Sequence, residues 1–264
     1  MKQEVYAIPK KELLGLSISI GTYSQFIGKI CELARLKKSS YICLANVHML
    51  INARDSNNYK SIINNADLVA PDGMPLVRSL KLFYGIEQRR VAGMDLLPDL
   101  LREAERRGIS VYFYGGSPEI IRDTREYIRK EFSGLMIAGS YSPPFRPLNP
   151  AEERSVVNEI NESGAQLVFV VLGCPKQENW MGLMKGKINA CMIGVGGALP
   201  VMIGLHKRAP VWMQEHCLEW LYRLIREPRR LFWRYALTNT GFILLITGAW
   251  IKYKLEATLE LLSH

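Results

Sequence analysis

The sequence has few cysteines, and their placement excludes the common cysteine-based sites. Its 5 cysteines are scattered through 264 residues and form no Cys-x-x-Cys pair. An odd number of scattered cysteines is typical of reduced thiols in a cytosolic compartment, and not of a disulfide framework or a zinc site. The chain also lacks Asp-x-Asp and His-Glu-x-x-His patterns, so we expect no catalytic metal and no other cofactor.

Long hydrophobic runs are absent as well. Residues 1–11 mix charges and have no apolar core, which predicts no signal peptide. The apolar stretch at residues 241–251 is much shorter than the roughly 20 residues that span a bilayer. Extending it back to residue 235 adds Thr238, Asn239 and Thr240, so we expect a segment in the membrane interface and a protein on the cytoplasmic side.

The overall composition is that of a globular protein with an excess of positive charge. Hydrophobic residues make up 48% of the chain and charged residues 22%, which excludes disordered and fibrous classes. The formal net charge of +9 indicates an anionic partner. Nucleic acid, a phospholipid surface and a phosphorylated substrate all satisfy that requirement.

Short apolar runs typical of buried strands alternate with segments of helical spacing. The strand-like runs lie at residues 41–45, 69–71, 109–114, 135–138, 167–172 and 190–195. Thr22 is a candidate N-cap of one helix, Ser117 of another with Pro118 at its first position, and residues 152–163 and 177–185 resemble two more. This order predicts an α/β fold, with a mainly parallel sheet covered by helices on both faces.

The composition changes near Arg208. Residues 206–234 carry seven lysines and arginines against three glutamates, interleaved with aromatic side chains. We therefore expect an α/β domain at residues 1–207 and a basic, helical C-terminal appendage at residues 208–264.

Two polar residues directly follow strand-like runs. Asn46 follows the run at 41–45, and Asp72 lies in the turn Pro71-Asp72-Gly73. In open parallel sheets, ligands bind just past the carboxyl ends of the strands, so Asp72 is the first candidate for a catalytic group. The alternative is structural, because Pro, Asp and Gly each favour a tight turn for their own backbone reasons.

Paired glycines follow two other predicted strands. Gly115-Gly116 and Gly196-Gly197 each precede a helix, where backbone N–H groups can bind an anion. The complete G-x-G-x-x-G pattern is absent, which weakens the case for a dinucleotide. Tight packing between helix and sheet is the alternative interpretation.

A polar cluster follows the predicted strand at 167–172. Gly173 is followed by Lys176, Gln177 and Glu178 at the start of a helix, an arrangement that suits sugar hydroxyls and a phosphate. A solvated helix start is the alternative. We do not favour Cys174 as a nucleophile, because nothing nearby in the sequence lowers its pKa.

Two arginines precede another predicted helix. Arg89 and Arg90 are followed by Gly93 and Asp95, and Asp95 could cap or start the helix. Phosphate binding by the guanidinium groups and a capped loop are both consistent with this segment.

Together these motifs resemble the WecG/TagA/CpsF family of bacterial glycosyltransferases. The matching segments are residues 45–46, 71–73, 90–95, 172–178, 194–197, 207–210 and 218–228. They cover almost the whole chain in the family's order. The resemblance implies a Rossmann-like α/β fold and a peripheral enzyme on the cytoplasmic face of the bacterial membrane.

The reaction implied by the resemblance is an inverting sugar transfer in teichoic acid or exopolysaccharide synthesis. N-acetylmannosamine, its uronic acid or a related hexose moves from a UDP-sugar to an N-acetylglucosamine or similar sugar on undecaprenyl diphosphate. The implied partners are these two substrates and an anionic membrane surface, without nucleic acid; a monomer and a homo-oligomer both remain open. Asp72 matches the family's catalytic base, and residues 208–264 match an appendage that completes the active site and touches the membrane.

The expected substrate-binding residues are turn glycines and polar side chains of these motifs. They are Asn46, Gly73, Arg90, Gly93, Asp95, Gly115, Gly116, Gly173, Lys176, Gln177, Glu178, Gly196, Gly197, Lys207, Arg208, Arg223, Arg226 and Arg230. Since no metal is expected, backbone N–H groups and arginines must stabilise the negative charge of the departing UDP.

Two other functions remain as alternatives. A nucleic-acid-binding module would explain the basic, aromatic C-terminal region but leaves Asp72 and the glycine turns without a role. A nicotinamide-dependent oxidoreductase would suit the sheet, but the glycine fingerprint is incomplete.

Overall fold

A six-stranded parallel sheet forms the centre of the computed structural model, which describes residues 7–262 and the side chains of residues 7–255. Its strand order is β4-β3-β8-β7-β5-β6. The strands are β3 (Ser40–Ala45), β4 (Leu68–Pro71), β5 (Val111–Gly115), β6 (Ile137–Tyr141), β7 (Leu167–Val171) and β8 (Cys191–Gly194). A separate antiparallel hairpin, β1 (Lys10–Leu13) with β2 (Leu16–Ser19), packs near β4.

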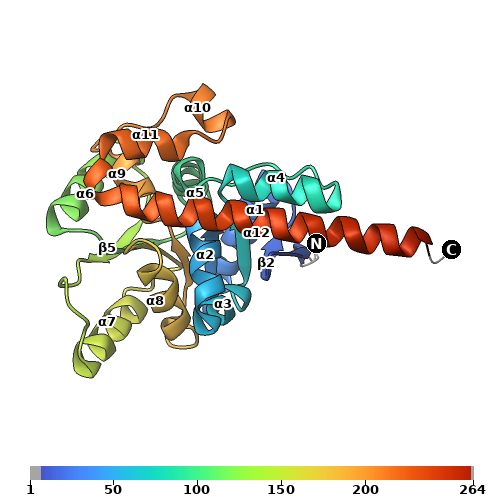
Figure 1. Ribbon diagram of the computed structural model, residues 1–264. Coiled ribbons are helices and arrows are strands. Elements are labelled where there is room, and N and C mark those ends of the chain that lie inside the picture. Colours follow the sequence, from blue (N-terminus) through green and yellow to red (C-terminus); the bar gives the residue numbers. More distant parts are fainter. Residues whose placement is uncertain (1–6, 263–264) are drawn as a thin grey trace.

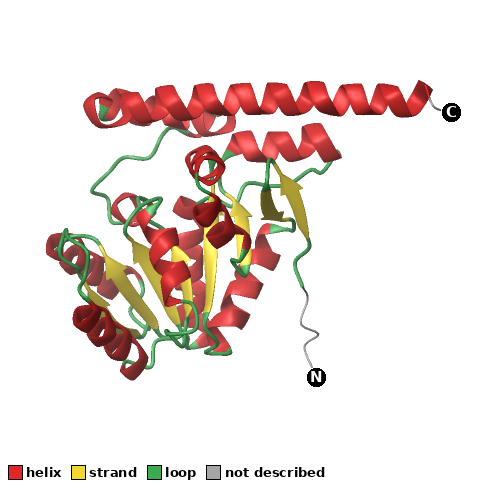
Figure 2. Ribbon diagram, turned by 60° about the horizontal axis from the view of Figure 1, so that its bottom comes forward, coloured by secondary structure: helices red, strands yellow, loops and turns green. Residues whose placement is uncertain are grey.

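Helices cover both faces of the sheet (Figure 2). One face packs against α1 (Tyr23–Arg35), α5 (Gly93–Arg107), α6 (Pro118–Glu131) and α9 (Ala198–Met202). The other packs against α2 (Val47–Asp55), α3 (Asn57–Asn64), α4 (Met74–Tyr84), α7 (Pro150–Glu162) and α8 (Lys176–Met184).

The strands divide their side chains between two apolar cores. In β5, Val111 and Phe113 point into the core that contains α1 and α5, whereas Tyr112 and Tyr114 point into the other. All four side chains are at most 2% exposed. A strand that is buried on both faces has apolar residues at successive positions, so its sequence is a continuous apolar run. These segments could therefore be recognised in the sequence.

The predicted fold class is confirmed, with shifts of a few residues at the element ends. Thr22 caps α1, its side chain accepting from the Gln25 N–H at 3.3 Å, and Ser117 caps α6 with Pro118 at its first turn. The β1–β2 hairpin and helices α2, α3 and α4 were not predicted. The hairpin strands have four residues each, and α2 and α3 have nine and eight, so tertiary packing stabilises these short elements.

The C-terminal region consists of α10 (Val211–Glu215), α11 (Glu219–Arg226) and the long α12 (Pro228–Leu262). In Figure 1, α12 crosses the molecule and extends beyond it, and it packs against α2, α4 and α11. Arg223 and Arg230 lie on different helices, because Pro228 excludes Glu227 from the helical conformation. Among the described residues, no helix is long and apolar enough to cross a membrane.

Candidate active site

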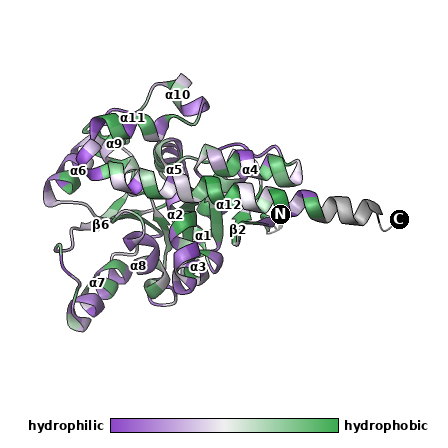
Figure 3. Cartoon of the chain, in the orientation of Figure 1, coloured by the Kyte–Doolittle hydropathy of each residue, from purple (hydrophilic) through white to green (hydrophobic). Residues whose placement is uncertain are grey.

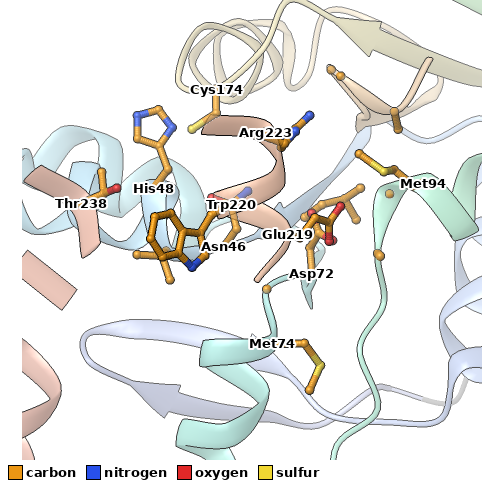
Figure 4. Close-up of a pocket in the computed structure, with 18 of the residues that line it drawn as sticks. Asn46, His48, Asp72, Met74, Met94, Cys174, Glu219, Trp220, Arg223 and Thr238 are labelled. Carbon is orange, nitrogen blue, oxygen red and sulfur yellow. The ribbon is translucent and has the colours of Figure 1, made fainter. Parts of the chain in front are cut away.

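A pocket of about 490 Å³ opens at the carboxyl ends of β3, β4, β7 and β8, where α11 and α12 close over it (Figure 4). This is the edge at which open α/β sheets bind ligands, and the volume is typical of a site for a small molecule. The C-terminal appendage therefore contributes a wall of the pocket, as the lining residues Glu219, Trp220, Arg223 and Arg234 show.

Asp72 lies in this pocket, in the turn between β4 and α4. Its backbone N–H donates to the carbonyl oxygen of Ala45 at 2.9 Å, so the turn is tied to the end of the neighbouring strand. Burial raises the pKa of Asp72 to about 7, and the nearby carboxylate of Glu219 adds to the increase. The guanidinium groups of Arg90 and Arg223 oppose it. A carboxylate with a pKa near neutrality is well matched to general-base catalysis.

Asn46 combines a structural role with a place in the pocket wall. Its side-chain oxygen accepts from the Met49 N–H at 3.1 Å and so caps α2. Gly73 packs beside it, and a Cβ at Gly73 would approach the Asn46 Cα to 3.3 Å. The close approach of these two turns holds Asp72 and Asn46 on the same side of the pocket.

Glycine turns after β7 and β8 form the opposite wall. Gly173 has φ of +75° and Gly196 has φ of +42°, backbone conformations that favour glycine. The side-chain oxygen of Gln177 accepts from the Gly173 N–H at 3.1 Å, and its amide also contacts Gly194 and Gly196. Gln177 thus holds the two turns together at the pocket.

Glu178 is fully buried behind Gln177 and does not reach the pocket. It accepts hydrogen bonds from the Tyr59 hydroxyl at 3.0 Å and from the Gln177 amide at 2.8 Å, and burial raises its pKa. The structure therefore assigns Glu178 a role in orienting Gln177, whereas the sequence suggested direct substrate contact.

The appendage is fastened to the α/β domain by ion pairs at the pocket rim. Arg90 donates to the Glu219 carboxylate at 2.8 Å and to the Gln214 side-chain oxygen at 3.0 Å. Arg208 donates to both oxygens of Asp95, at 2.5 and 2.8 Å. A bidentate pair of this kind gives geometric specificity, so the start of the appendage has a defined position on α5.

Positive charge dominates the pocket lining. Four arginines, Arg90, Arg223, Arg230 and Arg234, line the pocket together with two carboxylates, those of Asp72 and Glu219. Arg223 reaches the glycine turn after β8, where a Cβ on Gly197 would lie 3.0 Å from its guanidinium nitrogen. Guanidinium and backbone N–H groups placed together are suited to binding a phosphate or diphosphate.

The structure brings together many of the residues expected at the site. Those that line the pocket are Asn46, Asp72, Gly73, Arg90, Gly93, Gly173, Gln177, Gly196, Gly197, Arg223 and Arg230. Those that do not are Asp95, Gly115, Gly116, Lys176, Glu178, Lys207, Arg208 and Arg226. The catalytic and binding roles themselves remain predictions.

The expected site residues that lie outside the pocket are held by local packing or face the solvent. Gly115 is the last residue of β5 and Gly116 follows it; β7 separates β5 from β8 in the sheet. A Cβ at Gly115 would lie 2.6 Å from the Val171 carbonyl oxygen. Close packing therefore requires Gly115. The side chain of Arg226 lies over the Tyr222 ring, 5.5 Å from its centroid, on the exposed side of α11. Lys176 and Lys207 are exposed.

Several lining residues were missed as site residues from sequence. They include His48, Cys174, Gln214, Glu219, Trp220, Arg234, Tyr235, Thr238 and Asn239. Most belong to the appendage, and only the docking of α11 and α12 brings them to the strand ends. Glu219 and Trp220 lie in the family-like segment 218–228, which was the one signal that could have pointed to them. Cys174 is a poor nucleophile, since burial raises the pKa of its thiol to about 12.

Among the residues that the structure describes, no three His, Cys, Asp or Glu side chains form a group that could hold a metal ion.

Two comparisons with known proteins give matches that span most of the chain. The model of the Glycosyl transferase WecG/TagA/CpsF family matches residues 11–256, a range that includes every residue lining the pocket. A Bacillus spizizenii protein named N-acetylglucosaminyldiphosphoundecaprenol N-acetyl-beta-D-mannosaminyltransferase is 34% identical over 207 residues, which cover 78% of each chain.

Proposed function

Because this chain belongs to the WecG/TagA/CpsF family of glycosyl transferases, we propose that it transfers a sugar from a UDP-sugar to N-acetylglucosamine on undecaprenyl diphosphate. The name of the Bacillus spizizenii relative supports this acceptor and N-acetylmannosamine as the transferred sugar. The proposal rests mainly on the position of Asp72 in the wall of an arginine-rich pocket, where its pKa of about 7 suits a general base.

The proposed transfer inverts the anomeric carbon and uses one carboxylate. Asp72 removes the proton from the acceptor hydroxyl while its oxygen bonds to the anomeric carbon and the bond to the UDP oxygen breaks. The proton remains on Asp72, and the electron pair leaves with UDP. The attacking hydroxyl and the leaving group therefore lie on opposite faces of the sugar, as in an inverting glycosidase.

The departing diphosphate is stabilised by the side of the pocket that faces the glycine turn after β8. Arg223 lies against Gly197, and Arg230 is carried in by the first turn of α12. Backbone N–H groups and guanidinium groups that are already oriented stabilise developing negative charge without reorganisation. In this proposal no metal is required, and turnover in excess EDTA tests that point; recovery only on addition of Mg²⁺ or Mn²⁺ would refute it.

The proposed location is the cytoplasmic face of the membrane, with α12 against the lipid. One face of α12 packs on the protein through Leu231 and Phe242, yet its outward face is also apolar. Trp233 is 72% exposed and Leu237 68%, and Figure 3 shows apolar colouring along much of the helix. A helix that is apolar on all sides requires a second apolar phase, which an interfacial position supplies.

Family membership supports a transferase over the two functions that the sequence left open. The basic, aromatic appendage, which suggested a nucleic-acid-binding module, instead closes the pocket around Asp72. Of the two glycine pairs that were considered for a dinucleotide, only Gly196-Gly197 lies in the pocket, against Gln177 and Arg223.

The decisive experiment supplies a panel of UDP-sugars together with a short-chain, lipid-linked N-acetylglucosamine diphosphate. Mass spectrometry of the product shows which supplied UDP-sugar is transferred, and the one-bond carbon–hydrogen coupling constant at its anomeric carbon reports inversion. We expect UDP-N-acetylmannosamine to react best. The proposal is wrong if no UDP-sugar yields product while the folded protein also fails to bind UDP.

A further inference from the structure

A second groove adjoins the pocket on the side away from the glycine turns. It is lined by the start of α1, by one face of α4 and by the loop at residues 86–89. Met74 lines both the pocket and this groove, so the two adjoin at this side chain. Figure 4 places Met74 close to the turn that carries Asp72.

The groove follows α4 away from Asp72. Met74, Val77, Arg78 and Lys81 line it, and their spacing of three and four residues places them on one helical face. With a rise of about 1.5 Å per residue, Arg78 lies roughly 6 Å and Lys81 roughly 10 Å along the axis from Met74. Basic side chains therefore begin about one helical turn beyond the catalytic turn.

Three cations line this groove against a single carboxylate. Arg78 donates to the Glu215 carbonyl oxygen at 3.3 Å, and Lys81 pairs with Glu87 at 2.6 Å. Both members of that pair are largely exposed, at 66% and 77% of their side-chain surfaces. Arg89 is exposed; its backbone carbonyl accepts from the Gln88 side chain, but its guanidinium makes no hydrogen bond or ion pair with any described residue. The exposed cations of the groove can therefore bind an anion.

We propose that this groove binds the diphosphate of the lipid-linked acceptor while its terminal sugar reaches Asp72. This inference rests on the proposed function. The UDP diphosphate belongs near Gly197 and Arg223, after β8, whereas the groove lies beyond β4, the edge strand. Asp72 follows β4 and lies between the two regions, which is the arrangement an inverting transfer needs for its incoming and departing groups.

The position also suits the lipid that follows the diphosphate. The outer end of α4 packs against α12, where Phe83 and Tyr253 meet edge to face at 6.1 Å between ring centroids. Exposed apolar residues lie at the same end, Leu82 on α4 and Ile251 on α12. An acceptor that leaves the groove along α4 therefore reaches the apolar surface proposed to face the membrane.

Kinetics with two acceptors tests the assignment. One acceptor is N-acetylglucosamine on a short prenyl diphosphate, and the other is N-acetylglucosamine linked to a neutral octyl group. Lys81→Ala and Arg89→Ala should each raise KM for the diphosphate acceptor about tenfold, because a charge-assisted hydrogen bond to phosphate is lost. KM for the octyl acceptor and for the UDP-sugar should not change. Arg102→Ala, which removes an exposed arginine of α5, is the matched control.

The outcomes distinguish a site for the acceptor diphosphate from a site for lipid headgroups and from a groove with no role in binding. Equal changes for the two acceptors, or none for either, overturn the inference. The inference is also overturned if the variants bind phosphatidylglycerol vesicles more weakly than the wild type while their KM for the short-chain diphosphate acceptor is unchanged. That result would identify the groove as a binding site for lipid headgroups.

A binding measurement decides the inference even if no transfer is seen. Farnesyl diphosphate is titrated by calorimetry in saturating UDP, which occupies the donor site. We expect the wild type to bind it about tenfold more tightly than Lys81→Ala or Arg89→Ala. Failure of the wild type to bind, or equal binding by the variants, overturns the inference, whereas absent turnover with intact farnesyl diphosphate binding would count against the proposed function alone.

Discussion

The guanidinium of Arg90 donates a hydrogen bond of 2.8 Å to the carboxylate of Glu219, although the two residues are 129 positions apart in the chain. The pair joins the loop after α4 to α11 and places a second carboxylate near Asp72. Glu219 raises the pKa of Asp72, while Arg90 lowers it. The docked appendage therefore influences the proposed base directly, as well as covering it.

Replacing Asp72 with Asn should abolish most turnover without unfolding the protein. The amide keeps the size of the side chain but cannot accept the acceptor's proton. Loss of a general base typically lowers kcat by about two to four orders of magnitude. UDP affinity, measured by calorimetry, should stay within a few-fold of the wild type. Near-normal turnover of the variant would remove Asp72 from the mechanism.

The stability of the free protein should fall as pH rises toward 7. Asp72 has a pKa of about 7 in the folded chain and about 3.9 when unfolded, so between these values the folded state binds a proton that the unfolded state lacks. Asp72→Asn removes this dependence. The variant should therefore exceed the wild type in unfolding free energy at pH 8, by about 4 kcal/mol, and match it near pH 4. Urea unfolding at both pH values measures this; parallel pH curves would contradict it.

Glu219→Gln should shift the acidic limb of the kcat/KM profile to lower pH. In the wild type this limb should have its midpoint near 7, where Asp72 loses its proton. Removing the Glu219 charge removes a contribution that raises this pKa and releases Arg90, which lowers it. The loss of the Glu219 charge and the release of Arg90 therefore both lower the pKa of Asp72. Glu215→Gln, on the exposed side of α10, is the control and should leave the midpoint in place.

Arg230→Ala should lower turnover about tenfold or more, even with a water-soluble acceptor, because one donor to the leaving diphosphate is lost. The neighbouring Arg229→Ala provides a matched control, since Arg229 is also exposed on α12 but does not line the pocket. Equal rates for the two variants would leave the arginines of α12 with a role in membrane binding only.

Trp233→Ser combined with Leu237→Ser should weaken binding to anionic vesicles about tenfold or more. Each side chain contributes apolar area on the outward face of α12, and burying a large apolar side chain is worth about 1.5–3 kcal/mol. Turnover of a short-chain, water-soluble acceptor should persist. Met136→Ser, which removes an apolar side chain that is 50% exposed near β6, should not affect sedimentation with vesicles. Unchanged vesicle binding by the double variant would place the membrane contact elsewhere.

The sequence by itself determined the sheet and the place of the candidate base. Strands such as β7 are apolar on both faces, so their residues form continuous runs that need no tertiary information to be recognised. Thr22 and Ser117 marked helix starts because capping is a local interaction. Asp72 was identified because a polar residue at the end of a parallel strand reaches the ligand-binding edge in any such sheet.

Only the tertiary structure decided which of the polar residues share the pocket with Asp72. Glu178 looked like a binding residue at a helix start, but its side chain turns into the protein toward Tyr59. Glu219 and Arg234 were not recognised as pocket residues, because they reach the pocket through the packing of α11 and α12 on distant parts of the chain. Such long-range contacts depend on how complete helices fit together, and no short segment of sequence specifies that fit.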